Sequence, residues 1–201
     1  MNEIKYSAGL VSKPFWFHEF KKTVKLLYEG YSISDIRKMN LEQNIYGAEK
    51  EYRAKEVFNC VSSRVKELDD RLVNIFINSD LSTQKAIALF CVLKSDRLFF
   101  EFLYEIYREK ILMSVPNLTN ADIIIFLKDK QCQNSDAAKW TDYTLKKLKN
   151  SYINYLFEAS FIRDKNKGIF ISPPIIDTEF VQYLKNNGYE TYLIAMTGVR
   201  T

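Results

Sequence analysis

Glycine and histidine are both scarce in this chain of 201 residues. A P-loop or a Rossmann fingerprint needs several glycines within a few residues, so that backbone N–H groups can approach a phosphate. The 6 glycines are isolated from one another, which excludes both motifs. The single histidine, His18, excludes a zinc site built from several histidines.

Cysteine is also sparse. Cys60, Cys91 and Cys132 are odd in number, far apart and without C-x-x-C spacing. Neither a disulfide framework nor a zinc knuckle is therefore indicated, and a reducing compartment fits this usage. Carboxylates are plentiful, but no spacing pairs two of them, and no cysteine lies in a setting that would activate its thiolate. We therefore predict a protein that is not an enzyme, with no catalytic residues, metal ligands or cofactor.

Long hydrophobic runs are missing. The most apolar stretch, residues 86–103, is interrupted by Lys94, Asp96 and Arg97, and neither half approaches the roughly 20 residues that a bilayer requires. The first 11 residues have no apolar signal-peptide run. The sequence therefore predicts a soluble cytoplasmic protein without a membrane partner.

Helix-forming residues are abundant, and with few glycines and prolines they predict a mainly all-α fold. We expect two helix-turn-helix-like lobes joined by a helical core, over residues 1–113 and 119–201. In the first lobe a helix starts at Pro14 and stops at Gly30. Ser32 and Asp35 begin a short helix, and a longer helix follows Gly47.

The middle of the chain predicts buried helices. Ser95 is expected to cap a helix to about Leu112 that is dense in aromatic residues, which indicates burial on more than one side. The segment 114–118 contains Pro116 and is the expected boundary between the lobes.

The second lobe repeats the scheme and adds a hairpin. Thr119 with Asp122 starts one helix, and Thr141 caps a long helix to about Phe161. The polar turn 163–168 lies between apolar flanks, which predicts a short β-hairpin near 161–172. Three helices followed by a basic hairpin are the order of a winged helix.

The positive charge is local. The formal net charge of the chain is +4. The segment 139–167 has the same excess, because three acids oppose its seven cations. The cations are Lys139, Lys146, Lys147, Lys149, Arg163, Lys165 and Lys167.

A helical wheel of residues 141–161 places Leu145, Leu148, Tyr152, Leu156 and Ala159 on one stripe. The opposite side carries Tyr143, Lys146, Lys147, Asn150 and Asn154. Lysine contacts phosphate, and asparagine can make a bidentate contact with adenine. This face therefore predicts a recognition helix for double-stranded DNA. The alternative is an ordinary solvated helix face.

The long helix of the first lobe is a weaker candidate for DNA binding. It carries Lys50, Arg53, Lys55, Arg64 and Lys66, but Glu49, Glu51, Glu56 and Glu67 are interleaved with them. Alternating signs are typical of a solvated helix with i,i+4 pairs. Lys50, Arg53 and Lys55 remain candidate DNA contacts.

Five segments, in this order, resemble the BrxA family of the bacteriophage exclusion (BREX) defence systems. They are residues 6–10 (YSAGL), 15–17 (FWF), 94–100 (KSDRLFF), 104–110 (YEIYREK) and 139–141 (KWT). The resemblance implies an all-helical cytoplasmic protein with helix-turn-helix elements that binds double-stranded DNA without catalytic activity. It also implies other BREX proteins as partners, among them a DNA methyltransferase, an ATPase, a phosphatase-like protein and a Lon-like protease.

Two functions stay open from the sequence. One is a DNA-binding accessory protein of a BREX system that holds the duplex mainly through phosphates. The other is a scaffold or adaptor that binds partner proteins, with an incidental basic patch.

Overall fold

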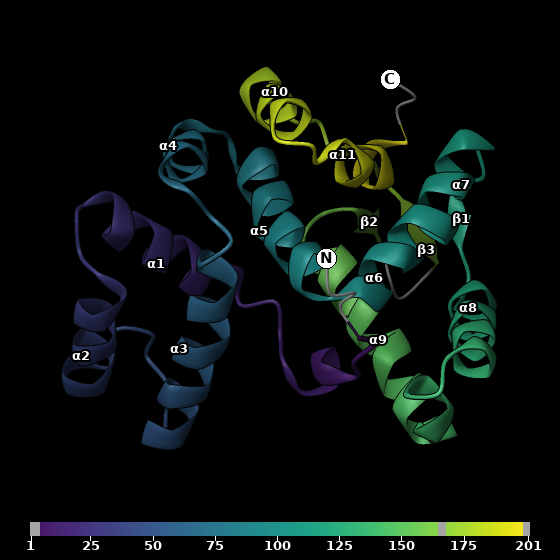
Figure 1. Cartoon of the computed structure of the whole chain (residues 1–201), viewed down its shortest axis with the longest axis horizontal. Coiled ribbons are helices and arrows are strands. Elements are labelled where there is room, and N and C mark those ends of the chain that lie inside the picture. The colour runs from purple at the N-terminus through teal and green to yellow at the C-terminus, as the bar shows by residue number, and fades with distance from the viewer. Residues whose placement is uncertain (1–4, 165–167, 199–201) are drawn as a thin grey trace.

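The computed structural model describes residues 5–164 and 168–198, which fold into helices and one small antiparallel sheet (Figure 1). The mainly all-α fold expected from the composition is confirmed. A short 3-10 turn, η1 (Gly9–Ser12), precedes the first unit of three helices. These are α1 (Phe17–Tyr28), α2 (Ile33–Gln43) and α3 (Glu51–Val65).

The predicted cap of α2 is present, but the predicted start of α1 is wrong. Ser32 and Asp35 form a reciprocal capping box. α1 begins at Phe17 instead of Pro14, because Trp16 adopts a left-handed conformation with φ of 50°. The turn directs the preceding Phe15 into the core, where it is 1% exposed. Packing of Phe15 therefore overrides the helix-start preference of Pro14.

The middle of the chain forms a helical layer. It contains α4 (Asp70–Asn78), α5 (Leu81–Ser95), α6 (Arg97–Phe102), the π-helical turn η2 (Leu103–Tyr107) and α7 (Arg108–Leu112). The cap of α6 is Asp96, whose carboxylate accepts from the Phe99 N–H at 2.9 Å. The expected cap, Ser95, instead donates to the backbone oxygen of Val92 in the helix before.

The second unit contains the sheet. Its elements are β1 (Asn117–Leu118), α8 (Asn120–Gln133), η3 (Ala137–Lys139), α9 (Asp142–Glu158), β2 (Ile162–Arg163) and β3 (Ile169–Ile171). The predicted hairpin is confirmed: Ile162 pairs with Ile171, and Arg163 pairs with Phe170. The predicted boundary segment contains β1, which pairs with β3 to give the strand order β1-β3-β2. The hairpin strands β2 and β3 are close in sequence, whereas β1 is more than 50 residues from its partner β3.

Two helices close the chain, α10 (Thr178–Asn186) and α11 (Glu190–Thr197). α11 packs against η2, α7 and α5, at the top of the view in Figure 1. None of the helices in the described ranges is long and apolar enough to cross a membrane.

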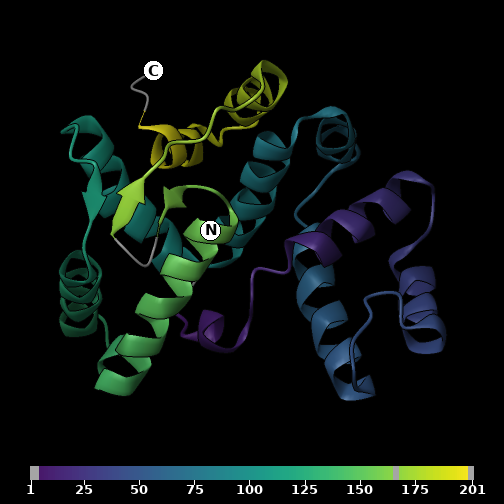
Figure 2. The ribbon, with the colours of Figure 1, turned by 180° about the vertical axis from the view of Figure 1, so that it is seen from behind.

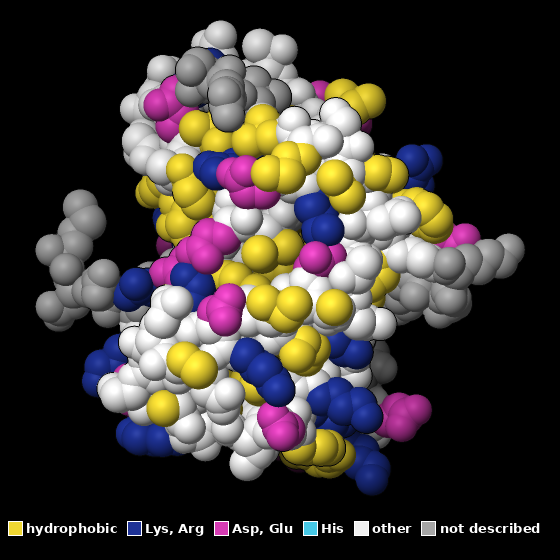
Figure 3. Space-filling model, turned by 90° about the vertical axis from the view of Figure 1, so that its right-hand side faces the viewer, with side chains coloured by type: hydrophobic (Ala, Val, Ile, Leu, Met, Phe, Trp, Pro, Cys, Tyr) yellow, Lys and Arg dark blue, Asp and Glu magenta, His cyan; other side chains and the backbone are white. Residues whose placement is uncertain are grey.

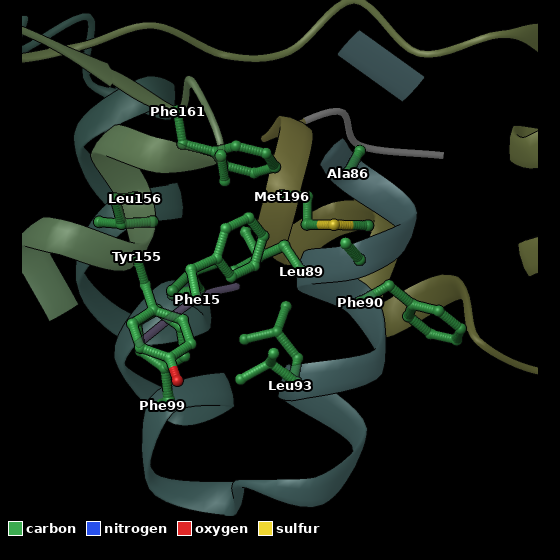
Figure 4. Packing of buried hydrophobic residues seen from close by; sticks show 14 of the residues in the cluster. Phe15, Ala86, Leu89, Phe90, Leu93, Phe99, Tyr155, Leu156, Phe161 and Met196 are labelled. Carbon is green, nitrogen blue, oxygen red and sulfur yellow. The ribbon is translucent and has the colours of Figure 1, made fainter. Parts of the chain in front are cut away.

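One cluster of buried side chains includes residues from both predicted lobes. Figure 4 shows Phe15 between Tyr155 of α9 and Leu89 of α5. Phe99 lies 4.5 Å from Tyr152 between ring centroids, and Phe102 is fully buried. The prediction that the aromatic helix is core is therefore confirmed. The division of the chain at 113 and 119 stays a prediction.

Candidate nucleic-acid interface

α9 presents the predicted apolar stripe to the core. Thr141 caps the helix, since its hydroxyl accepts from the Thr144 N–H at 3.3 Å. The five residues of the stripe are all at most 2% exposed: Leu145, Leu148, Tyr152, Leu156 and Ala159. Since this stripe is buried, the 3.6-residue period turns the opposite residues away from the core.

The first half of α9 carries an exposed polar surface, here called the α9 basic face: Tyr143, Lys146, Lys147 and Asn150. Tyr143 is 68% exposed, and the Lys147 ammonium lies 5.4 Å from the centroid of its ring. This end of the helix extends below the rest of the second unit in Figures 1 and 2. The α9 basic face is therefore sterically open to a large partner.

The two lysines of this face keep their charge uncompensated. Among the described residues, no carboxylate forms an ion pair with Lys146 or Lys147. Asp142 precedes Lys146 by one turn but is not paired with it. Lys139 differs, because its ammonium lies 3.5 Å from the carboxylate of Asp136. Lys149 is half-buried on the side of the helix.

Asn154 lies apart from the α9 basic face. It is exposed, but it lines a groove of about 170 Å³ together with Leu10, Val11 and Lys13 of the N-terminal segment. That segment crosses the second half of α9, so Asn154 faces the chain itself. Proximity to the N-terminal segment could not be inferred from the helical wheel.

The hairpin places Arg163 at the other end of α9. Arg163 is exposed and lines a groove of about 730 Å³ with Phe157 and Glu158 from the last turn of the helix. Twelve residues separate Lys146 from Glu158, which corresponds to about 18 Å along the helix axis. Lys165 and Lys167, the other predicted hairpin contacts, lie outside the described residues.

The candidate contacts of α3 are largely compensated. Arg53 pairs with Glu56 at 2.6 Å and lies 5.2 Å from the centroid of Trp16. Lys55 pairs with Glu51 at 2.6 Å, and Lys50 is the exposed N-cap residue. The interleaved acids thus neutralise two of the three cations.

Arg64 is buried, although its place among the charged residues of α3 suggested a surface position. It is 4% exposed and donates to the backbone oxygen of Phe15, to that of Pro14 at 3.0 Å and to Tyr155 Oη at 2.6 Å. Arg64 follows Val57 by seven residues, which is two helical turns, and so belongs to the buried face. That spacing was the signal in the sequence from which the burial of Arg64 could have been predicted.

α3 and α9 nevertheless begin on the same side of the molecule. Their N-terminal ends both lie at the lower edge in Figures 1 and 2. In Figure 3, Lys and Arg side chains gather toward the lower edge, whereas the middle of that face is mixed and apolar. The tertiary structure therefore places the N-terminal ends of both helices on one side of the molecule.

Polar contacts join α6 to α8 and to the N-terminal segment. Glu101 of α6 accepts from Tyr6 at 2.5 Å and from Arg97 at 2.7 Å, and it pairs with Lys130 of α8 at 2.7 Å. Burial acts to raise the pKa of Glu101, but these hydrogen bonds hold it below its usual range. The carboxylate therefore stays ionised and ties α8 to α6 and to the N-terminal segment.

Among the residues that the structure describes, two thiols and one carboxyl group are buried. Desolvation raises the pKa of Cys60 and of Cys91, so both thiols stay protonated at neutral pH. Desolvation also raises the pKa of Asp96 to about 6. Asp96 caps α6, is 7% exposed and lies near the buried tyrosines of α9, Tyr152 and Tyr155.

Comparisons with known proteins give the family. The BrxA family model matches residues 4–188. A BREX protein BrxA of Bacillus cereus (strain H3081.97) is 35% identical over 198 residues, which are 98% of this chain and 99% of that protein. The chain belongs to the BrxA family. A crystal structure of an uncharacterized protein from Magnetospirillum magneticum has the same fold, with a TM-score of 0.78 at 19% identity over 96% of this chain and 99% of that one.

Proposed function

We propose that this BrxA-family protein is a cytoplasmic, non-enzymatic accessory protein of a BREX phage-defence system that binds double-stranded DNA mainly through phosphate contacts. Family membership supports the role in BREX defence. The observation that carries DNA binding is the α9 basic face, where Lys146 and Lys147 are exposed, adjacent and free of carboxylate partners within the described chain. Unpaired lysines at an open helix end suit phosphate oxygens.

The order of the elements suggests how the duplex would dock. A strand, two helices and a hairpin follow one another in the chain, and the strand and the hairpin form one three-stranded sheet. This is the order of a winged helix-turn-helix. In helix-turn-helix proteins the second helix enters the major groove with its N-terminal residues nearest the bases. By this geometry Lys146 and Lys147 contact phosphates and Asn150 faces the base edges.

The remaining candidates would contribute unequally. Arg163, with Lys165 and Lys167, would reach the backbone about 18 Å along the helix axis from the α9 basic face. Lys139 and Lys149 flank that face, one paired and one half-buried. Asn154, Arg53 and Lys55 are proposed as peripheral contacts only, because Asn154 lies beside the N-terminal segment and the two cations are paired with glutamates. Lys50 is exposed at the start of α3 and is also proposed as a peripheral contact.

A scaffold role is the second candidate, and one observation favours it. The groove of about 730 Å³ lies between α1, α5, the end of α9 and β2, and its rim includes Leu81 and Phe157, which are 54% and 40% exposed. Exposed apolar side chains beside a groove suit a protein partner. In either role the BREX methyltransferase, ATPase and phosphatase-like protein would supply the chemistry.

Salt dependence of duplex binding separates the two functions. Affinity for a fluorescein-labelled duplex would be measured by anisotropy between 50 and 200 mM salt for wild type and for Lys146→Ala/Lys147→Ala. The matched control is Lys25→Ala/Lys185→Ala, which removes the same charge from exposed positions on α1 and α10. About 0.9 of the log–log slope is lost per phosphate contact, so the α9 variant should lose about 1.8.

The control variant should keep the slope of wild type. Equal slopes for all three proteins would show that the α9 basic face does not contact phosphate. Duplex binding too weak to measure at 50 mM salt would favour the scaffold function.

A further inference from the structure

A cavity of about 430 Å³ opens beside the N-terminal end of α3, and three aromatic side chains line it. They are Trp16, Tyr46 and Tyr52. The α9 basic face uses none of them. A cavity of this size is large enough for a small ligand.

The aromatic side chains are held in different ways. Trp16 is half-buried before α1, and its left-handed backbone is rare for a bulky residue and typical of functional positions. The Tyr46 hydroxyl lies 2.6 Å from Thr23 Oγ1, which fixes that ring. Tyr52 is 66% exposed on the first turn of α3 and has no comparable restraint. Two walls are therefore preformed, and one ring is available to a ligand.

Charged groups of both signs surround these rings. The lining includes Lys50 and Arg53, and the Arg53 guanidinium lies 5.2 Å from the Trp16 centroid. It also includes the carboxylates of Glu19 and Glu49. The cavity thus combines ring faces, cations and hydrogen-bond acceptors.

We propose that this aromatic pocket binds one unpaired nucleotide of single-stranded DNA. Successive aromatic and cationic groups are the means by which proteins hold single strands, because every base has a face that stacks. The base stacks on Tyr52, and an adjoining phosphate lies near Lys50, which, unlike Arg53, forms no ion pair among the described residues. The site is separate from the α9 basic face, because none of its lining residues belongs to α9.

A cationic ligand fits the pocket less well. Aromatic cages bind quaternary ammonium groups over ring faces. Here Arg53 already lies over Trp16, and Lys50 adds a second positive charge beside it. The Trp16 ring is therefore already covered by a cation, whereas the exposed ring of Tyr52 is open to a base.

The two carboxylates imply a preference among bases. Carboxylates accept hydrogen bonds and cannot donate them when ionised. Cytosine presents an amino donor at the position where thymine presents a carbonyl acceptor. The pocket therefore favours cytosine over thymine, two pyrimidines of similar size.

The test is anisotropy of labelled dC and dT 12-mers with the full-length protein. Wild type should bind dC12 more tightly than dT12. Tyr52→Ala should weaken dC12 binding at least about fivefold, the lower value for one lost base–aromatic stack, and Tyr52→Phe should restore it. The matched control is Tyr28→Ala, a tyrosine that is 54% exposed at the end of α1 and belongs neither to the pocket nor to the α9 basic face, and it should leave dC12 binding unchanged.

A second measurement reports on the pocket directly. The chain has 2 tryptophans, Trp16 and Trp140, so Trp140→Phe leaves Trp16 as the sole indole. Addition of dC12 should then quench the tryptophan emission, and Tyr52→Ala should diminish the quenching. Lys50→Gln should lower the salt slope for dC12 by about 0.7, the value for one single-strand phosphate contact.

Equal affinity of wild type and Tyr52→Ala for dC12 would overturn the proposal. Tighter binding of dT12, or quenching by choline but not by dC12, would also overturn it. The outcome is separable from duplex binding, because Lys146→Ala/Lys147→Ala alters the duplex slope and should leave Trp16 quenching intact.

Discussion

α3 and α9 are alike in shape and opposite in the state of their charges. They contain 15 and 17 residues, each buries one apolar face, and their N-terminal ends lie on the same side of the molecule (Figure 1). On α3, Lys55 and Arg53 are each paired with a glutamate at 2.6 Å. On α9, Lys146 and Lys147 have no such partner among the described residues. Carboxylate spacing, more than the number of cations, therefore decides where positive charge is available.

The two helices also differ in what they give to the core. α3 contributes the guanidinium of Arg64, and α9 contributes the Tyr155 hydroxyl that accepts from it at 2.6 Å. Tyr155 in turn donates to the backbone oxygen of Lys13 at 2.7 Å. The joint between the two helices is therefore polar and buried, and it encloses the segment that leads into α1.

Breaking this joint should have the largest effect. Arg64→Ala removes the charged donor of buried hydrogen bonds to Phe15, Pro14 and Tyr155 and leaves the Phe15 oxygen without a donor, so we expect a loss of about 3–5 kcal/mol of unfolding free energy. Urea denaturation followed by circular dichroism measures it. The control, Lys66→Ala, alters an exposed cation of the same region and should cost no more than about 0.5 kcal/mol. Similar losses for both variants would contradict the structural role of Arg64.

The burial of Asp96, the N-cap residue of α6, predicts that the stability of the protein depends on pH. Burial raises the pKa of Asp96 to about 6, from an ordinary value of 3.8, so the folded state favours the protonated form. Its contribution to stability is full below about pH 4 and is lost as the pH rises to about 6, a change of about 3 kcal/mol by pH 7. Asp96→Asn stays neutral and should not show this loss.

The measurement is unfolding free energy at pH 4 and pH 7. The stability of Asp96→Asn relative to wild type should increase by about 2.4 kcal/mol between these values, because the unfolded carboxyl is already partly ionised at pH 4. Asp80→Asn is the control, since Asp80 caps α5 through the Thr83 N–H at 2.7 Å but is exposed. A relative stability of Asp96→Asn that does not change with pH would exclude a raised pKa.

Giving α9 the charge pattern of α3 should weaken duplex binding. Asn150→Glu places a carboxylate four residues after Lys146 and three after Lys147, where helical neighbours pair. We expect the salt slope for duplex DNA to fall by about 1–2, the value for one or two lost phosphate contacts. Asn150→Gln is the neutral control. If Asn150→Glu bound the duplex like wild type, the difference between the helices would have no functional meaning.

The reverse change on α3 should have the smallest effect. Glu51→Gln/Glu56→Gln releases Lys55 and Arg53 from their partners, at a cost of about 0.2–0.5 kcal/mol per pair in stability. Affinity for the duplex should rise modestly, because the change frees two cations near the N-terminal end of α3, which lies on the same side of the molecule as that of α9. The same anisotropy titration measures it, and a decrease in affinity would place α3 outside the DNA contact.

The sequence predicted local features well and long-range features poorly. The capping boxes at Ser32 and Thr119, the cap at Thr141 and the hairpin near 161–172 are all present, because each depends on residues close in sequence. The start of α1 and the cap of α6 were wrong, since Phe15 and Asp96 are placed by contacts with other helices. β1 was not predicted, because a strand of two residues is too short to show an alternation of apolar and polar side chains.

The candidate site divides in the same way. The buried stripe of α9 and the exposure of Lys146 and Lys147 follow from the helical period alone. The position of Asn154 beside the N-terminal segment does not, because the two are more than 140 residues apart in the chain. The availability of Lys165 and Lys167 stays a prediction.

The sequence by itself determined the helical class, the local starts of most helices and the concentration of positive charge in residues 139–167, because these depend on composition and on spacings of a few residues. Only the tertiary structure decided that Arg64 is a buried link, that Asn154 lies beside the N-terminal segment, and that Trp16, Tyr46 and Tyr52 line one cavity. Those relations join segments distant in the chain, and their geometry is set by how the helices pack around a common core.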